Sequence, residues 1–70
     1  MYTRKRLDND LAVLNEKMPK IGSTFRFEAQ GRNGYTGLDL YNAEQCHSTL
    51  ETGTPKECYN AACRYLAATL

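Results

Sequence analysis

Three cysteines and a single histidine are the residues whose types could hold a metal ion. Cys46 and His47 are adjacent, and Cys58 and Cys63 lie five positions apart in a predicted helix. Structural zinc sites use closely spaced cysteine pairs or histidines one helical turn apart. Because five helical positions turn one side chain by about 140° from the other, Cys58 and Cys63 point apart. The sequence therefore predicts no metal site.

A catalytic set is not apparent either. His47 falls in a weak strand, where it is expected to be solvated rather than to act as a base. No serine, aspartate or cysteine has a sequence context that would activate it as a nucleophile, and Cys58 is most simply a small core residue. Paired carboxylates would need a concave site, which two helices on a small sheet rarely enclose. We therefore expect a protein that is not an enzyme and that needs no cofactor.

Tyrosine and arginine on one face of a predicted hairpin indicate recognition instead. The chain has five tyrosines and two phenylalanines but no tryptophan, and the alternation assigns both phenylalanines to the core. Tyrosine and arginine dominate interaction hot spots, although strand propensity alone also explains a half-exposed tyrosine. The partner-binding residues that we predict are Arg26, Arg32, Tyr35, Asp39 and Tyr41.

A helix at the end of the chain is the element with the clearest start signal. Thr54 followed by Glu57 is a capping box, and Pro55 falls at the first helical position, where its missing N–H costs nothing. A helix therefore runs from about Pro55 to the C-terminus. Periodicity places on its core face Cys58, Ala62, Tyr65, Leu66 and Thr69.

The outer side of this helix carries small residues, namely Ala61, Ala67 and Ala68. Alanine is the best helix former and sits comfortably in water. The alternative interpretation is a place where another helix comes close, for example from a second copy of the protein.

The first helix is expected between Tyr2 and Lys17. Its leucines recur at spacings of four and three, which gives a narrow apolar stripe suited to a sheet or to one partner helix. Thr3 could cap its start, or Asp8 could cap a shorter helix and leave the basic residues before it as an arm. Pro19 ends the helix. The stripe consists of Leu7, Leu11, Leu14 and Met18.

The middle of the chain alternates like three strands. Ser23–Gln30 and Tyr35–Tyr41 each place apolar residues on one side, with a turn at Gly31–Gly34 between them. After a second turn at Asn42–Gln45, Cys46–Glu51 gives a weaker strand that suits a sheet edge. The predicted fold is a single α+β domain over residues 1–70, with two helices packed on one face of a three-stranded antiparallel meander, in the order α-β-β-β-α.

Two hairpin registers keep the apolar faces together. A two-residue Asn33-Gly34 turn, the strongest short hairpin signal, sets Glu28 opposite Asp39. A four-residue loop over Gly31–Gly34 sets Arg26 opposite Asp39 instead. Because opposite charges across a strand pair attract and like charges repel, we favour the four-residue loop.

Composition narrows the class of protein. The net charge of +1 suggests neither a polyanion partner nor DNA mimicry. No apolar run is long enough for a membrane span or a signal peptide, so we expect the cytoplasm of the cell that makes the protein and free cysteine thiols. A domain of this size is marginally stable. A homodimer that covers the leucine stripe or the alanine side is therefore a reasonable expectation.

The charge is uneven along the chain. Residues 1–35 hold seven Lys or Arg against four acids, and residues 36–70 hold two against four. The residues that would carry nucleic-acid binding are Arg4, Lys5, Arg6, Lys17, Lys20 and Lys56.

The element order and the C-terminal segment resemble the double-stranded-RNA-binding domain. Gly53 and the run Lys56–Cys63, followed by Leu66, look like that family's second helix, and Leu14-Asn15-Glu16 looks like its first. The resemblance implies contacts of the first helix in the minor groove of RNA. Of the several lysines that the family places at the start of its second helix, only Lys56 is present, and the family's Gly-Pro-His loop is absent. Few phosphates would be neutralised, so little affinity is expected.

In size and composition the chain also resembles the small accessory proteins of bacteriophages, which bind a host protein and block or redirect it. We therefore predict a non-enzymatic regulator or inhibitor that binds a host protein in the host cytoplasm. Binding of double-stranded RNA or another nucleic acid is the alternative.

Overall fold

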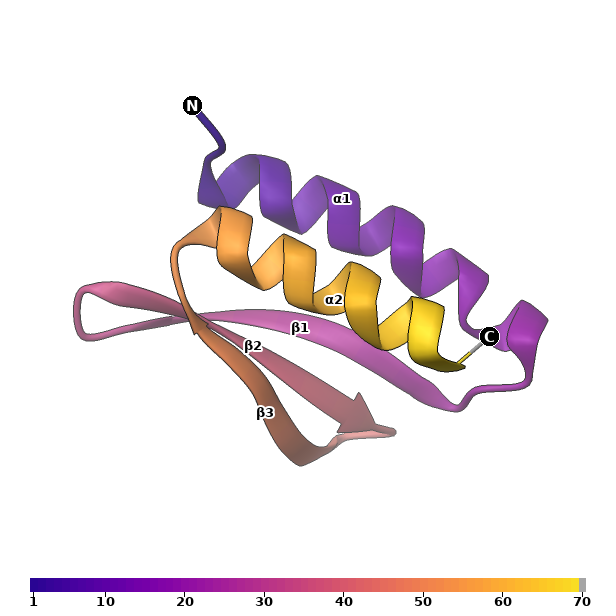
Figure 1. The fold of residues 1–70 in the computed structure, drawn as a ribbon. Helices are drawn as coiled ribbons and strands as arrows, with labels where there is room; N and C mark the ends of the chain where they lie inside the picture. Colours follow the sequence, from indigo (N-terminus) through magenta and orange to yellow (C-terminus); the bar gives the residue numbers. More distant parts are fainter. Residues whose placement is uncertain (70) are drawn as a thin grey trace.

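The computed structural model describes residues 1–69 as two helices packed on one face of a sheet (Figure 1). The elements in chain order are α1 (Arg4–Lys17), the short 3₁₀ turn η1 (Pro19–Ile21), β1 (Phe25–Arg32), β2 (Tyr35–Asn42), β3 (Gln45–Gly53) and α2 (Pro55–Thr69). The sheet is antiparallel with the order β1-β2-β3. The two helices lie side by side and run in the same direction, so that both begin at the same end of the molecule (Figure 1). The predicted α+β meander is confirmed.

The start of α1 is set by Thr3, whose hydroxyl accepts a hydrogen bond from the Arg6 backbone N–H at 3.2 Å. Asp8 therefore lies inside the helix and does not cap a shorter one. The basic residues Arg4–Arg6 form the first turn and are not a separate arm. The helix ends at Lys17, before Pro19, as the sequence predicts.

The start of α2 has the predicted capping box. The Thr54 N–H donates to Glu57 Oε1 at 2.9 Å, and the Glu57 N–H donates to Thr54 Oγ1 at 3.2 Å. The expected core face is partly wrong, because Ala61 is buried and Thr69 is exposed. Ala61 lies on the side of α2 that carries Arg64, which approaches Glu51 of β3, whereas α1 lies on the opposite side, where Tyr59 meets Tyr2. Ala61 is therefore buried on the β3 side of the helix, away from α1.

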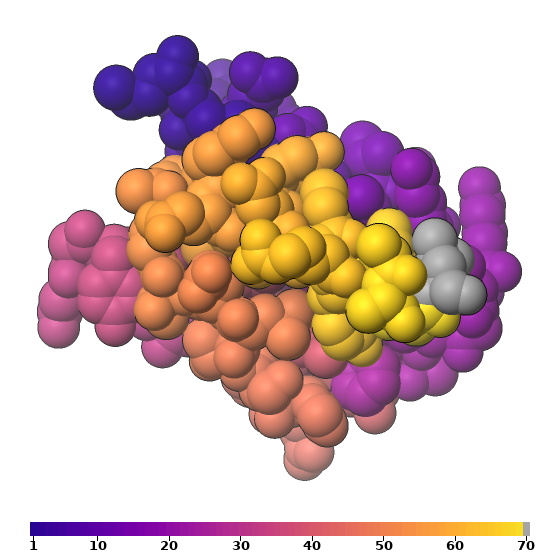
Figure 2. Space-filling model, in the orientation of Figure 1, coloured from indigo at the N-terminus to yellow at the C-terminus, as the bar shows by residue number. Residues whose placement is uncertain are grey.

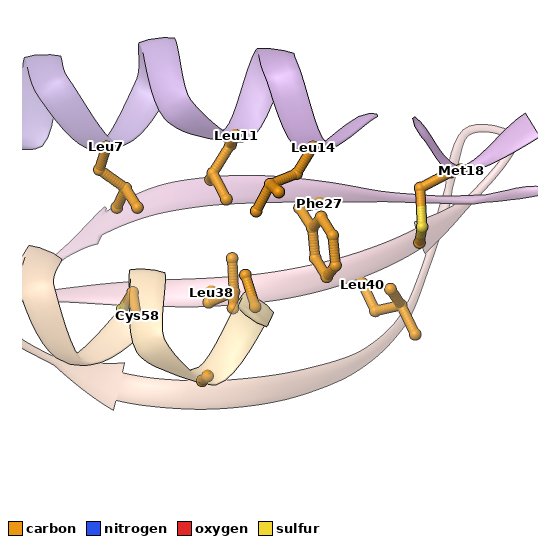
Figure 3. Close-up of a cluster of buried hydrophobic side chains, with 10 residues drawn as sticks. Leu7, Leu11, Leu14, Met18, Phe27, Leu38, Leu40 and Cys58 are labelled. Carbon is orange, nitrogen blue, oxygen red and sulfur yellow. The ribbon is translucent and has the colours of Figure 1, made fainter. Parts of the chain in front are cut away.

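The core lies between the helix layer and the sheet (Figure 3). The leucine stripe of α1 points into it, as predicted, and meets Phe27 from β1 together with Leu38 and Leu40 from β2. Leu7 and Leu38 are completely inaccessible to solvent. Because the stripe is covered by the chain's own sheet, it is not available to a second copy of the folded protein.

The register of the first hairpin corrects the prediction. The strands pair through the two-residue Asn33-Gly34 turn, which sets Glu28 opposite Asp39, so the four-residue loop is wrong. Gly34 has φ of 79°, in the left-handed region that favours glycine. The two acids are neutralised by neighbours that are not directly opposite: Arg32 binds Asp39 at 2.7 Å, and Arg26 binds Glu28 at 3.0 Å.

Strand β3 is an edge strand, as expected, but its alternation is interrupted. Two register shifts break its pairing with β2, and such bulges re-aim side chains and protect an edge from further pairing. One consequence is that Glu51 lies opposite Leu38 on the helix side, where Arg64 of α2 approaches it at 3.7 Å.

Candidate functional site

The face of the sheet opposite the helices, here called the outer face, holds the predicted partner-binding residues. Phe27, Leu38 and Leu40 point to the core, so the residues that alternate with them point away from it. Within the described residues both helices lie on the other side of the sheet (Figure 1), so no layer covers the outer face.

The arginines and tyrosines of the outer face form two pairs in register. Arg26 lies opposite Tyr41, and Arg32 lies opposite Tyr35. The two arginines are six positions apart along β1, which places the two pairs about 20 Å apart. The outer face thus presents an arginine and a tyrosine towards each end.

Asp39 lies beneath this surface rather than on it. It is 2% exposed, its Oδ2 accepts a hydrogen bond from Arg32 Nη2 at 2.7 Å, and its Oδ1 accepts one from Thr49 Oγ1 at 2.8 Å. Since both carboxylate oxygens have a partner within the chain, Asp39 cannot contact another protein directly. Within the predicted set, Asp39 therefore positions Arg32 and does not itself contact the partner.

Gly37 makes room for Arg32, and sequence reasoning missed this. A Cβ at Gly37 would come within 2.5 Å of Arg32 Nε, so the guanidinium lies against the bare backbone of β2. A glycine inside a strand often marks a close approach of another group, and this signal was available in the sequence. No feature of the sequence marks Thr49 as the second partner of Asp39.

Arg26 is held by three neighbours. Its guanidinium lies over the ring of Tyr41, with Cζ 5.1 Å from the ring centroid. Its Nε donates to Glu28 Oε1 at 3.0 Å and its Nη1 donates to the carbonyl oxygen of Ala43. Tyr35 is less constrained and is 46% exposed.

The outer face can therefore offer arginine donors that are already oriented. A guanidinium carries five N–H donors, of which Arg32 uses one and Arg26 two in the bonds described above. Their side chains remain 38% and 41% exposed. Carboxylates and carbonyl oxygens are the groups that such donors bind best.

The six basic residues of the nucleic-acid alternative are divided between the two ends of α1. Lys17 and Lys20 lie about 20 Å from the first turn, given the rise of an α-helix. Arg4 is engaged within the fold, because its Nη2 donates to the Ala29 carbonyl at 2.8 Å and its Nε pairs with Asp8 at 3.0 Å. Of the six, the structure brings together the side chains of Arg6 and Lys56, because both lie over the ring of Tyr2 at the start of the helices.

At this end, four side chains form what we call the basic–aromatic cluster: Tyr2, Arg6, Lys56 and Tyr59. The rings of Tyr2 and Tyr59 are 5.6 Å apart. Lys56 Nζ lies 5.3 Å from the Tyr2 centroid and 5.6 Å from that of Tyr59, and Arg6 Cζ lies 5.2 Å from that of Tyr2. Figure 2 shows the indigo N-terminal residues against the orange start of α2. Sequence reasoning missed both tyrosines as partners of these cations.

The hydroxyl group of Tyr2 fixes its ring, and both tyrosines of the cluster have a raised pKa. Tyr2 donates a hydrogen bond to Asp10 Oδ2 at 2.6 Å. Burial and this bond raise the pKa of Tyr2, and a hydrogen bond with Cys63 raises the pKa of Tyr59. Both rings therefore stay neutral at physiological pH.

The open edge of β1 is bound by side chains of α1. Asn15 Nδ2 donates to the Phe27 carbonyl at 3.0 Å, and the Phe27 N–H donates to Asn15 Oδ1 at 2.7 Å. A shallow groove of about 360 Å³ runs between α1 and β1 here. Two of its polar residues, Arg4 and Asn15, bind the strand edge, so the groove is a seam between α1 and β1.

The cysteines do not come together. Cys58 is buried, and its Sγ lies 3.5 Å from the Thr36 carbonyl. Burial also raises the pKa of the Cys58 thiol. Cys46 is exposed and Cys63 is half-buried. Among residues 1–69, no three His, Cys, Asp or Glu side chains gather as metal ligands would.

Comparison with known proteins assigns neither a family nor a function to the chain. Neither a protein-family model nor a curated protein nor a solved structure matches the chain. In the part of the chain that the structure describes, no helix is long and apolar enough to cross a membrane.

Proposed function

We propose that this protein is a non-enzymatic binding module, a phage-type regulator or inhibitor, whose outer face engages a host protein in the host cytoplasm. The observation that carries the proposal is the uncovered sheet face on which Arg26 and Arg32 are held in place by neighbouring side chains. The small size of the chain and its mixed charge support the phage-type class.

Prior ordering of the arginines favours binding. Immobilising a long side chain at an interface costs about 0.5–1.5 kcal/mol. Arg32 is already fixed on Asp39, and Arg26 is fixed on Tyr41 and Glu28. A partner that supplies carboxylates or carbonyl oxygens then gains hydrogen bonds without that ordering cost.

The size of the outer face limits the affinity that it can supply. A sheet three strands wide and eight residues long measures roughly 25 by 15 Å, whereas a stable interface buries about 800 Å² on each partner. The partner is therefore expected to reach beyond the sheet onto the hairpin tip at Asn33-Gly34, or to bind transiently.

Charge on the outer face is balanced, and this affects the expected salt response. Two arginines are matched there by two acids, Glu28 and Asp39. Binding through this face should depend on the positions of the donors rather than on a net field, so raising the salt concentration should weaken it only modestly.

A capture experiment tests the proposal. The tagged protein, the double variant Arg26→Ala/Tyr35→Ala and the control Arg64→Ala/Val13→Ala are each incubated with nuclease-treated bacterial lysate. The control likewise removes one arginine and one exposed apolar side chain, but from the helix layer. We expect a host protein that the unchanged protein and the control retain and the Arg26/Tyr35 variant loses. Equal retention by all three proteins, or no retained protein, would remove the outer face from consideration.

A second candidate function, nucleic-acid binding, is favoured by one specific observation. The basic–aromatic cluster lies on the helix layer, away from the outer face. A strong decline of nucleic-acid affinity with salt would support this candidate, and a flat response would count against it.

A further inference from the structure

We propose that the basic–aromatic cluster takes a short stretch of single-stranded nucleic acid by its phosphates and bases, an inference that rests on the second candidate function above and names its ligand. It differs from the outer face in its position, in its net positive charge and in the class of partner that it fits.

The two cations of this site, Arg6 and Lys56, form no ion pair among the described residues. In residues 1–69, the ion pairs join Arg4 to Asp8, Arg26 to Glu28, Arg32 to Asp39 and Arg64 to Glu51. Arg6 and Lys56 take part in none of them, and they outnumber Asp10, the acid that accepts a hydrogen bond from Tyr2 of the cluster. Charge left uncompensated on neighbouring side chains is the electrostatic requirement for binding a phosphodiester strand.

The position of these cations also opposes local helix stability. The first turn of α1 holds Arg4, Lys5 and Arg6 and no acid, although the helix macrodipole favours acids there and disfavours bases. Sequences break such local rules mostly where function requires it. In this chain the exception falls beside Lys56 and two tyrosine rings, which provide the further features of a site.

The tyrosine rings hold the cations at the surface. Lys56 Nζ contacts both rings at 5.3 and 5.6 Å, and Arg6 lies over Tyr2 at 5.2 Å. A cation over an aromatic ring is favourable by about 0.5–1 kcal/mol at an exposed position. The positive groups are thus ordered before any ligand arrives.

A single strand fits this arrangement better than a duplex or an acidic peptide. Sites for single strands combine a basic track with aromatic side chains on which bases stack, and both parts are present here. A duplex needs a wider basic surface, whereas Lys17 and Lys20 lie about 20 Å away along α1, beyond the acidic residues Asp8 and Glu16. An acidic peptide would make no use of stacking.

The test measures fluorescence anisotropy of a labelled oligouridylate of about ten nucleotides, a length within the range of known single-strand sites. Arg6→Gln/Lys56→Gln is compared with Lys17→Gln/Lys20→Gln, which changes the net charge equally. We expect the first variant to weaken binding by about tenfold or more and the second by less than about twofold. With two phosphates neutralised, by Arg6 and Lys56, log K should fall with log salt at a slope of about −1.4.

A second pair of variants tests the aromatic part. Tyr59→Leu keeps apolar volume but removes a ring from the cluster, and Tyr35→Leu makes the same change on the outer face. Loss of one stacked base should weaken binding by about fivefold or more for Tyr59→Leu only. The chain has no tryptophan, so quenching of its tyrosine emission by the oligonucleotide gives an independent readout of stacking. Circular dichroism checks that each variant is folded.

Several results would overturn the proposal. If the two double glutamine variants weaken binding equally, binding depends only on the overall charge of the protein and not on this cluster. A duplex of the same length that binds more tightly would exclude the single-strand assignment, and polyglutamate that binds equally well would exclude recognition of phosphates. Absence of binding at low salt would exclude the site altogether.

Discussion

Asp39 is the residue on which the geometry of the outer face depends. Its carboxylate is almost inaccessible, yet it has two partners, Arg32 and Thr49. Removing one partner of a buried acceptor costs more than the hydrogen bond itself contributes, because the acceptor is left without a replacement. Arg32 therefore has a structural role as well as its proposed role in binding.

Replacement of Arg32 tests this double role. We expect Arg32→Gln to lower the free energy of unfolding by about 1–3 kcal/mol, because it deprives buried Asp39 of a charged donor. The matched variant Arg26→Gln should cost less than about 1 kcal/mol, since its partner Glu28 is 40% exposed. Urea unfolding of both variants provides the comparison. Equal losses would mean that burial of Asp39 does not distinguish the two ion pairs.

The capping box at α2 makes a residue-level prediction about pH. The N–H of Thr54 donates to Glu57 and holds the pKa of that carboxyl below its ordinary value of 4.5. A pKa depressed in the folded state means that the charged form stabilises the fold above the ordinary value and that this stabilisation is lost as the pH falls through the folded pKa.

The variant Glu57→Ala should therefore melt below the unchanged protein near neutral pH, and the gap should narrow as the pH falls below about 4. Thermal unfolding followed by circular dichroism across this range measures the gap. A gap that stays constant at every pH would contradict the assigned role of the carboxylate.

At the scale of elements, local signals are sufficient for most of the fold. Thr54, Glu57 and Pro55 specify the start of α2, and alternation is enough to separate Phe25 and Phe27 from the outer face. These patterns act between residues close in sequence, so they need no knowledge of tertiary contacts. Helix and strand positions could accordingly be predicted.

The features that could not be predicted depend on contacts between elements. The hairpin register followed Asn33-Gly34 even though it opposes two acids, because Arg32 reaches Asp39 from the hairpin end. Burial of Ala61 depends on how α2 packs against β3. The same holds for the basic–aromatic cluster, which joins residues more than fifty positions apart.

Asn15 provides a prediction at this scale, since it satisfies the backbone groups of Phe27 at the open edge of β1. Asn15→Leu should lower the free energy of unfolding by about 1–3 kcal/mol and should promote self-association, because an unprotected strand edge pairs with other chains. Sedimentation velocity and urea unfolding measure the two effects. Asn9→Leu, an exposed position of the same helix, is the control and should change stability by about 0.5 kcal/mol or less.

At the scale of the whole molecule, one small hydrophobic core supports both the outer face and the basic–aromatic cluster. The leucine stripe that suggested a dimer is buried against the chain's own sheet. The folded chain therefore does not need a second copy to cover that stripe.

The variant Leu7→Ala tests this view of the core. Leu7 is completely buried, so its truncation should cost about 2–5 kcal/mol, a large part of the stability of so small a domain. The melting temperatures of the variant and of the unchanged protein should not depend on protein concentration. Melting temperatures that rise with concentration would indicate that the stripe is stabilised by association between chains.

The central claim is that the outer face binds a protein partner, and the most direct test is the affinity of the captured host protein for three versions of this chain. Isothermal titration should give similar dissociation constants for the unchanged protein and for Arg64→Ala/Val13→Ala. It should give a constant at least about tenfold higher for Arg26→Ala/Tyr35→Ala, because that variant removes two hot-spot residue types from the face. Equal constants for all three would contradict the account and place the contact elsewhere on the molecule.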